Sequence, residues 1–407
     1  MTPHSPLPHA KPADVGLCPD RTQRLMDVLR REVESGRLPG AVAMVARRGQ
    51  IALLEAVGQQ DPATGTPMQT DSIFRIYSMT KPVVSVAVMM LVERGQLLLS
   101  DPVSRWLPEY ATQQVATDHG LEPVRNPATV QDLLRHTAGL TYEFLGTSSV
   151  QQQYGQVKIA SRERSNAEFS QTLAALPLQF QPGSVWAYSR ATDVLGRLVE
   201  VVSGQGLGAF LQTEIFGPLG MVDTGFAVPP AQHHRIAEPF AHDPDGGVPM
   251  KVLEPREVPA MEGGGGGLMS TAMDYARFLQ CLRNRGELNG VRLLGAHTVD
   301  FMTADHLGGI PVDGTLLPPG HGFGLGFAVR THLGLSPVPG SVGLYYWGGI
   351  AGTTFFVDPA LDMYAMLMVQ APNQRDYYRV IGSVLDLPIP STPVLASFAR
   401  PERESSS

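Results

Sequence analysis

Hydrophobic and polar positions at the two ends of the chain follow patterns typical of helices and strands. Residues 20–36, DRTQRLMDVLRREVESG, carry apolar side chains at helical spacing and end at Gly36, which predicts a helix. Residues 40–58, GAVAMVARRGQIALLEAVG, predict two apolar strands around the turn Arg47-Arg48-Gly49. Further strands are predicted at FGLGFAVR (323–330), LYYWGG (344–349), GTTFFVD (352–358) and MYAMLMVQA (363–371), followed by a last helix at YYRVIGSVLDL (377–387) and a polar tail.

The middle of the chain has a different pattern, with apolar residues mostly at helical spacing from Ser78 to about Asp305. This order of elements predicts an α/β (α+β) fold, in which both chain ends contribute to one antiparallel sheet flanked by helices. We expect residues 1–77 and 306–407 to form this discontinuous sheet domain and residues 78–305 to form an inserted, mainly helical domain. The active site is expected between the two.

Composition and charge narrow the range of partners. Hydrophobic residues make up 43% and charged residues 17% of the 407 residues, which is the balance of a globular protein with a large core. The net charge of -7 comes without any basic block, so neither nucleic acid nor an anionic membrane surface is expected as a partner.

The cysteines and the apolar runs indicate a compartment. Cys18 and Cys281 are far apart in sequence, without metal-type spacing, and suggest free thiols. The first residues, MTPHSPLPHAKPADVG, lack the apolar core of a secretion signal, and the run VVSVAVMMLV is too short to span a bilayer. We therefore expect a soluble, cytoplasmic protein that uses no metal or other cofactor, while the oligomeric state stays open.

One charge stands at the head of an apolar helix. The segment SMTKPVVSVAVMMLVERG (78–95) reads as one helix, and Pro82 places its start at or just after Ser78, because proline is tolerated only in the first turn. Ser78 then lies at the positive end of the helix dipole, with Lys81 on the same face about 5–6 Å away between Cβ atoms. A buried lysine loses hydration, and a neutral lysine can take a proton from a serine hydroxyl. The alternative is a capping serine with a lysine that snorkels to the surface.

Several segments resemble those of one family. Ser-x-x-Lys is a motif of class A β-lactamases and penicillin-binding proteins. LLRHTAGLTY (133–142), PGSVWAYSRATDVLG (182–196), GGGGLMSTAMDYARF (264–278) and WGGIAGTTFF (347–356) resemble segments of class C β-lactamase-like proteins, in the same order. The chain is thus similar to the serine β-lactamase and penicillin-binding-protein superfamily over roughly residues 15 to 390. Its Trp-Gly-Gly segment most resembles the family VIII carboxylesterases.

The resemblance implies a set of site residues. Ser78 is expected to be the nucleophile, Lys81 its base partner, and Tyr188 a residue that shares the proton. The backbone N–H groups of Ser78 and Ile350 are expected to form the oxyanion hole. Gly348 and Gly349 would let a substrate approach the strand closely. Trp347 is expected to wall the substrate pocket, with a large core residue as the alternative. Arg190 occupies the place of an asparagine in the family, where it faces either substrate or solvent.

Departures from the family pattern indicate which reaction is favoured. Lys-Thr-Gly, which helps to hold the substrate carboxylate in β-lactamases, is replaced by Trp347-Gly348-Gly349, and no lysine follows Lys251. We therefore expect a serine carboxylesterase that cleaves neutral, short-chain esters through an acyl-enzyme, with possible transfer of the acyl group to another alcohol. The alternatives are a β-lactamase or D-amino-acid peptidase, and a binding module on a hydrolase scaffold that no longer catalyses.

Other polar features are interpreted as structural. His136 lies at the end of a predicted helix, and the resemblance implies a structural role rather than that of a base. His233 and His234 have no partner ligands in the sequence, so no metal site is expected. The glycine run 263–267 lacks the Gly-Lys-Ser/Thr of a phosphate loop and is expected to pass close to the site or to pack tightly. No Gly-x-Ser-x-Gly elbow of an α/β-hydrolase occurs in the chain.

Overall fold

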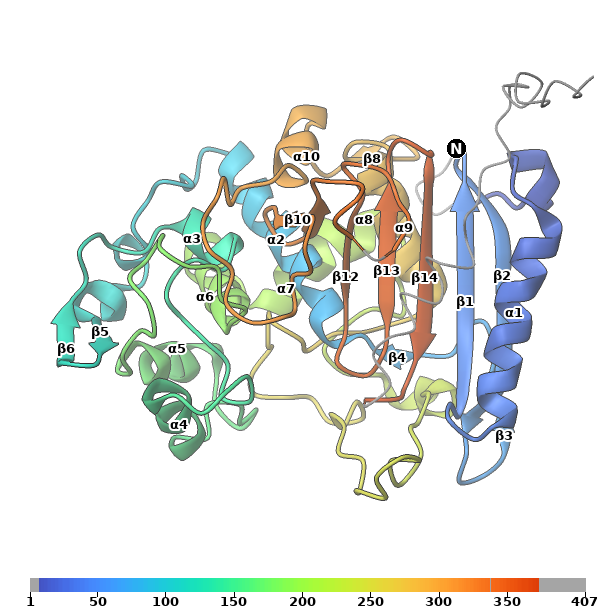
Figure 1. Ribbon diagram of the computed structural model, residues 1–407, viewed down its shortest axis with the longest axis horizontal. Helices are drawn as coiled ribbons and strands as arrows, with labels where there is room; N and C mark the ends of the chain where they lie inside the picture. The colour runs from blue at the N-terminus through green and yellow to red at the C-terminus, as the bar shows by residue number, and fades with distance from the viewer. Residues whose placement is uncertain (1–6, 337, 373–407) are drawn as a thin grey trace, which may run out of the picture.

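Both ends of the chain meet in one antiparallel sheet. In the computed structural model, which describes residues 7–336 and 338–372, β1 pairs with β14 from Ala41 opposite Val369 to Arg47 opposite Met363. This arrangement confirms the predicted fold class, an antiparallel sheet formed by both chain ends and flanked by helices (Figure 1). The sheet has the order β10 (His321–Phe323), β11 (Ala328–Arg330), β12 (Tyr345–Gly348), β13 (Thr354–Asp358), β14 (Met363–Val369), β1 (Gly40–Arg47), β2 (Gln50–Asp61) and β3 (Thr66–Pro67).

The central strand β1 is buried on both faces, because helices cover both sides of the sheet. Side chains alternate between the faces of a strand. Ala41, Ala43 and Val45 pack with residues of α1 (Pro19–Glu34), while Val42 and Met44 belong to the larger core on the other face. On that second face α9 (Ala272–Arg283) packs against β14 and β1. The nearly continuous apolar sequence of β1 follows from this double burial.

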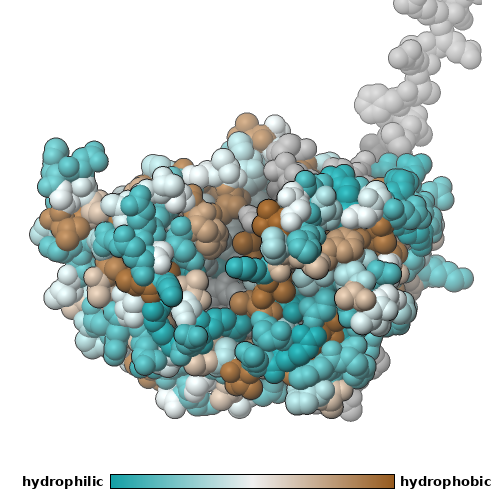
Figure 2. Space-filling model, turned by 90° about the horizontal axis from the view of Figure 1, so that it is seen from below, coloured by the Kyte–Doolittle hydropathy of each residue, from teal (hydrophilic) through white to brown (hydrophobic). Residues whose placement is uncertain are grey.

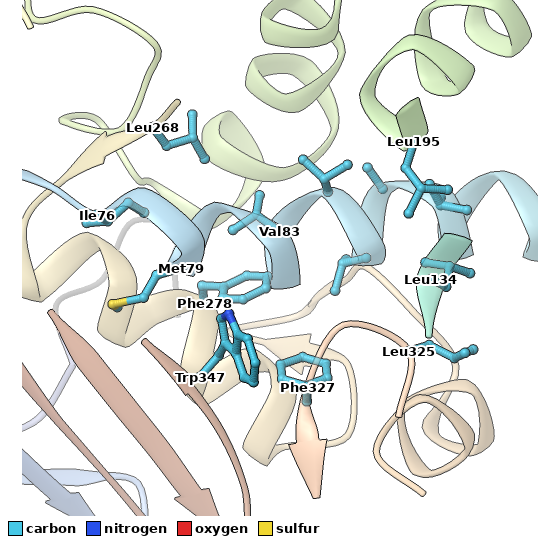
Figure 3. Packing of buried hydrophobic residues seen from close by; sticks show 14 of the residues in the cluster. Ile76, Met79, Val83, Leu134, Leu195, Leu268, Phe278, Leu325, Phe327 and Trp347 are labelled. Atoms are coloured by element: carbon cyan, nitrogen blue, oxygen red, sulfur yellow. The ribbon is translucent and has the colours of Figure 1, made fainter. Parts of the chain in front are cut away.

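Helix α2 (Thr80–Glu93) runs through the middle of the larger core. Its residues from Thr80 to Leu91 are all buried, and it packs against α6 (Ala191–Ser203). Figure 3 shows side chains from several elements gathered around it, among them Leu195 of α6, Phe278 of α9 and Trp347 of β12. The remaining helices are α3 (Val130–Leu134), α4 (Ser149–Gln156), α5 (Asn166–Ala174), α7 (Leu207–Leu211), α8 (Gly217–Leu219) and α10 (Ala296–Met302).

Three short ribbons complete the described strands. The ribbon of β4 (Phe74–Arg75) and β7 (Met269–Ser270) matters most for the site, because β4 leads into Ser78 and β7 follows the glycine run. The other two are β5 (Gln114–Thr117) with β6 (Gly120–Pro123), and β8 (Glu287–Leu288) with β9 (Val291–Arg292).

One predicted strand differs in the structure, and the predicted start of one helix, at or just after Ser78, is confirmed. The segment 323–330 is not one strand, because β10 ends at Phe323 and β11 begins at Ala328, antiparallel to it. The chain reverses at Gly326, whose φ of 102° favours glycine, so the single-strand interpretation was wrong. Ser78 itself lies in a 3₁₀ turn, Tyr77–Met79, and the α-helix starts at Thr80. The predicted last helix, 377–387, falls outside the described residues.

The boundary between a sheet domain and a helical domain stays a prediction. Helix α9, which the sequence division assigns to the helical part, packs on the sheet. The larger hydrophobic cluster also joins residues of both parts, including Val42 of β1 and Leu195 of α6.

Cys18 and Cys281 are both free thiols, as predicted. Within the described residues no single helix has the length and apolar character to cross a membrane, although α6 passes that test when combined with residues 207–219, at a bend of 77°. On the face shown in Figure 2 hydrophilic residues predominate, and hydrophobic residues emerge in separate small groups.

Candidate active site

Ser78 lies on a sharp turn between β4 and α2. Tyr77, just before it, has a φ of 44°, which is uncommon for a residue other than glycine and typical of strained functional turns. Two hydrogen bonds to the residues just after Ser78 hold the turn. The Tyr275 hydroxyl donates to the Met79 carbonyl at 2.9 Å, and the Leu268 N–H donates to Thr80 Oγ1 at 3.1 Å. The Ser78 hydroxyl is therefore held at the head of a buried helix.

Lys81 is buried beside Ser78 and does not snorkel to the surface. Its Nζ donates to Ser78 Oγ at 3.2 Å, to the Tyr142 hydroxyl at 2.9 Å and to the Gly265 carbonyl at 2.6 Å. These three acceptors match the three donors of an ammonium group. The residue is only 1% exposed, so its charge is satisfied almost entirely by these contacts.

Tyr188 approaches Ser78 from the segment that precedes α6. Its hydroxyl donates to Ser78 Oγ at 2.6 Å, and the Lys81 Nζ lies 4.6 Å from the centroid of its ring. Backbone bonds hold the segment, because the Ala187 N–H donates to the His136 carbonyl and the Trp186 N–H to the Pro311 carbonyl. The structure thus brings Ser78, Lys81 and Tyr188 together, as the sequence predicted.

Tyr142 is a second tyrosine of the site, and sequence reasoning missed it. It ends the segment LLRHTAGLTY, after α3, whose start is fixed by a capping box of Thr129 and Asp132. Burial raises the pKa of the Tyr142 phenol well above its usual range, and the neighbouring Tyr188 raises it further. Tyr142 is therefore a neutral hydroxyl that accepts a hydrogen bond from Lys81.

The glycine run holds the acceptor of Lys81 in place. The Gly265 carbonyl accepts from Lys81, while its N–H donates to the buried carboxylate of Asp193 at 2.7 Å. A Cβ at Gly264 would meet the Thr192 carbonyl oxygen at 2.4 Å, and one at Gly265 would meet the Asp193 carboxylate at 2.8 Å. The prediction that this run packs tightly beside the site is confirmed.

The end of β12 contacts the turn that carries Ser78. A Cβ at Gly349 would meet the Ile76 carbonyl oxygen at 2.6 Å, and Thr353 Oγ1 donates to the same oxygen at 3.3 Å. Ile350 follows directly and lines the same cavity as Ser78. Gly349 is therefore required by close packing against the turn.

Trp347 takes a different position from the expected pocket wall. It is 6% exposed and lies in the core near α2 (Figure 3). Its Nε1–H donates to the Tyr188 hydroxyl at 3.3 Å, and the two ring centroids are 5.1 Å apart. Neither Trp347 nor Gly348 nor Gly349 is among the residues that line the cavity at Ser78. Trp347 therefore contacts Tyr188 from the core.

A cavity of about 250 Å³ opens at Ser78. Arg190 lies in its wall, where its guanidinium pairs with Glu143 at 2.5 Å and with Asp193 at 3.4 Å and stacks on the Tyr142 ring at 4.7 Å. Its charge is thus paired with protein carboxylates. The sequence alone did not decide whether Arg190 faces substrate or solvent. The lining residues are Tyr77, Ser78, Tyr142, Glu143, Phe144, Ala160, Arg162, Arg190, Asp193, Leu253, Met261, Gly263, Gly265, Gly266, Gly267 and Ile350.

The histidines that drew notice in the sequence lie outside the group around Ser78. His136 is 1% exposed, and its Nδ1 lies 3.1 Å from Ser189 Oγ. Burial, with Lys81 nearby, lowers the pKa of His136 well below its usual value. His233 Nε2 bonds the Val228 carbonyl. Among the described residues, no group of three or more His, Cys, Asp or Glu side chains could hold a metal ion.

The fold is that of the serine β-lactamase superfamily. The sequence model of the Beta-lactamase family matches residues 25–382, so the chain belongs to this family. The resemblance noted in the sequence is thereby confirmed.

Particular relatives narrow the comparison. Esterase EstB of Burkholderia gladioli is 37% identical over 370 residues, which cover 85% of this chain and 89% of that protein. The structure of EstCE1, described as a hydrolase with promiscuous acyltransferase activity, matches with a TM-score of 0.76 at 28% identity and covers 89% of this chain and 98% of that one. Simvastatin synthase (LovD) from Aspergillus terreus, in its unliganded selenomethionyl form, matches with a TM-score of 0.75 at 26% identity, over 90% of this chain and 98% of that one.

Proposed function

We propose that this protein is a serine carboxylesterase that forms an acyl-enzyme on Ser78. The observation that carries the proposal is the contact of the Ser78 hydroxyl with both Lys81 and Tyr188, at 3.2 and 2.6 Å, on the wall of a cavity. A serine hydroxyl becomes a useful nucleophile only when an adjacent group can take its proton. The esterase relatives support the ester as the bond that is cleaved.

In the first step the Tyr188 and Lys81 pair carries one proton fewer than its fully protonated form, with either the lysine amine or the tyrosine phenol deprotonated. Ser78 Oγ attacks the ester carbonyl carbon while its proton passes to this pair. The carbonyl oxygen gains negative charge, and the N–H groups of Ser78 and Ile350 are the donors proposed to stabilise it. The bond to the alcohol then breaks, and the alcohol oxygen takes the proton from the same pair. The acyl group is left on Ser78.

In the second step, water attacks the acyl-enzyme, and the Tyr188 and Lys81 pair takes its proton and returns it to Ser78 Oγ. An alcohol can replace water here, which would transfer the acyl group instead of hydrolysing it. The acyltransferase activity named for EstCE1 supports this second outcome.

The substrate is proposed to be a small ester rather than a β-lactam. No lysine stands at the end of β12, where β-lactamases place their Lys-Thr-Gly, and Arg190 already pairs with Glu143 and Asp193. A β-lactam carboxylate would therefore lack a partner at the end of β12, the position from which β-lactamases supply one. An unpaired charge in a partly dry cavity is costly.

A comparison of three substrates under one set of conditions tests the proposal. We expect kcat/KM for p-nitrophenyl butyrate to exceed that for nitrocefin and for benzylpenicillin by at least about tenfold. Equal or faster turnover of either β-lactam would favour a β-lactamase instead. A protein that cleaves none of them, and that a fluorophosphonate does not label, would be a binding module.

A further inference from the structure

One arginine in the cavity wall has no anionic partner among the described residues. Arg162 lies in the loop between α4 and α5 and lines the same cavity as Ser78. Its Nη2 is buried and has no hydrogen-bond acceptor in the part of the chain that the structure describes. The loop is tied to the segment before the glycine run, because the Met261 N–H donates to the Arg162 carbonyl at 3.2 Å. The loop that carries Arg162 is thus held against the site.

The other charges of the cavity are already paired. The two carboxylates of the lining, Glu143 and Asp193, both bond Arg190, and Asp193 also accepts from the Gly265 N–H. Lys81 uses its donors on Ser78, Tyr142 and Gly265. Arg162 is therefore the cation of this wall that is left to meet a ligand.

A guanidinium without a partner is costly to bury. Arginine stays protonated in proteins, so it cannot escape the cost by losing its charge. Burial lowers the pKa of Arg162, while the nearby Tyr77 and Asp193 act in the opposite direction without forming a hydrogen bond to it. An incoming anion would supply the missing acceptor through a short, charge-assisted hydrogen bond.

We propose that Arg162 binds an anionic group of the substrate, so that the preferred esters carry a carboxylate on an apolar body. This inference rests on the proposed function. The apolar part of the ester would contact Phe144, Leu253 and Met261 of the same lining. The sequence argument expected neutral esters because a lysine is missing from β12. The cation comes instead from a loop that no family motif covers.

Matched pairs of esters test this inference on either side of the bond. On the acyl side, mono-p-nitrophenyl adipate is compared with p-nitrophenyl hexanoate, in which a methyl group replaces the carboxylate. On the alcohol side, meta-acetoxybenzoate is compared with meta-tolyl acetate. Each ester is measured with the wild-type protein, Arg162→Gln, Arg162→Lys and the control Arg164→Gln, with spontaneous hydrolysis subtracted.

We expect Arg162→Gln to lower kcat/KM for the anionic ester of at least one pair by about tenfold or more, mainly through KM. Its neutral counterpart should stay within about twofold. Arg162→Lys should recover part of the loss, because it restores the charge but not the fork of donors. Arg164 lies on the same loop, but its guanidinium donates to the Lys158 and Val157 carbonyls, so Arg164→Gln should not separate the two esters of a pair.

Two outcomes would overturn the inference while leaving the esterase intact. One is an equal effect of Arg162→Gln on both esters in both pairs, with phosphonate labelling of Ser78 unchanged. The other is a wild-type protein that prefers the neutral ester in both pairs. If the wild-type protein cleaves none of the four esters and a fluorophosphonate leaves Ser78 unlabelled, the proposed function itself fails.

Discussion

At the scale of single residues, the site is organised around the ammonium group of Lys81. Three acceptors surround it, and each comes from a different stretch of the chain: Ser78, Tyr142 and Gly265. Such an arrangement holds a buried charge and at the same time fixes the distance between the lysine and the serine. Removing one acceptor should therefore weaken catalysis without removing the nucleophile.

Tyr142→Phe tests this arrangement. The variant takes one acceptor from a charged donor, a loss of about 1.5–3 kcal/mol, so kcat/KM for p-nitrophenyl butyrate should fall about tenfold or more. Tyr364→Phe is the control, because the Tyr364 hydroxyl is buried elsewhere in the described structure without a hydrogen-bond partner. Its activity should stay within about twofold. Equal activity of the two variants would contradict a role for Tyr142 at Lys81.

His136 should make the stability of the protein depend on pH, and it should take no part in catalysis. The folded protein keeps this histidine neutral, since burial lowers its pKa, whereas the unfolded chain takes up a proton below about pH 6.5. Acid therefore favours unfolding, at up to about 1.4 kcal/mol per pH unit, and the penalty is absent above about pH 6.5.

The measurement is the free energy of unfolding by denaturant between pH 8 and 5, for the wild type and for His136→Asn. The difference in the free energy of unfolding between the two proteins should be constant above about pH 6.5. Below about pH 6.5 the wild type should lose stability relative to His136→Asn. A difference that does not change with pH would show that His136 is not held neutral. Loss of all ester turnover in His136→Asn, with the fold intact, would instead return it to the list of candidate bases.

At the scale of elements, the glycine run lets two parts of the site approach each other. Gly264 lies against Gly196 of α6, with 3.3 Å from its would-be Cβ to the Gly196 Cα, and Gly265 lies against Asp193. The run then enters β7, which pairs with β4 just before Ser78. One ribbon thus positions both Ser78 and the Gly265 carbonyl that accepts a hydrogen bond from Lys81.

Gly264→Ala and Gly266→Ala test whether the glycine run is needed for close packing or merely lies near the site. An added Cβ at Gly264 would clash with the Thr192 carbonyl at 2.4 Å, whereas one at Gly266 would make ordinary contacts with Tyr77 at 3.6 Å or more. Gly264→Ala should lower the free energy of unfolding by about 1–3 kcal/mol, and Gly266→Ala by less than about 1 kcal/mol. Equal losses in chemical denaturation would mean that the run is not held by this contact.

Strand patterns explain part of what the sequence could and could not predict. The nearly continuous apolar runs of β1 and β14 predicted two strands, and the order of elements along the chain predicted that both belong to one sheet. In β12 side chains alternate between the two faces, so Trp347 lies on the same buried face as Tyr345. Trp347 is therefore a core residue, which was the alternative to the expected pocket wall. The reversal at Gly326 was hidden, because glycines alternating with apolar residues also suit a strand.

At the scale of the whole molecule, the site depends on contacts between segments that are distant in sequence. Ser78 and Lys81 were predictable because they are three residues apart at the point where a helix begins. Tyr188 was predictable because its segment resembles a family motif. Tyr142 and Asp193 lie in segments that were noticed, but a single sequence does not say which loop folds back onto Lys81. Arg162 belongs to the polar segment SRERS, which has no feature to distinguish it from solvated surface.

The central claim is that Ser78 is the nucleophile and that Lys81 and Tyr188 move its proton. The most direct test is to treat the wild-type protein with a fluorophosphonate, to locate the adduct by peptide mass, and to follow p-nitrophenyl butyrate turnover in parallel. We predict one adduct, on Ser78, with activity lost in proportion to labelling, no adduct and no turnover in Ser78→Ala, and much slower labelling in Lys81→Met and Tyr188→Phe. An adduct on another serine, or full activity in Ser78→Ala, would contradict the account.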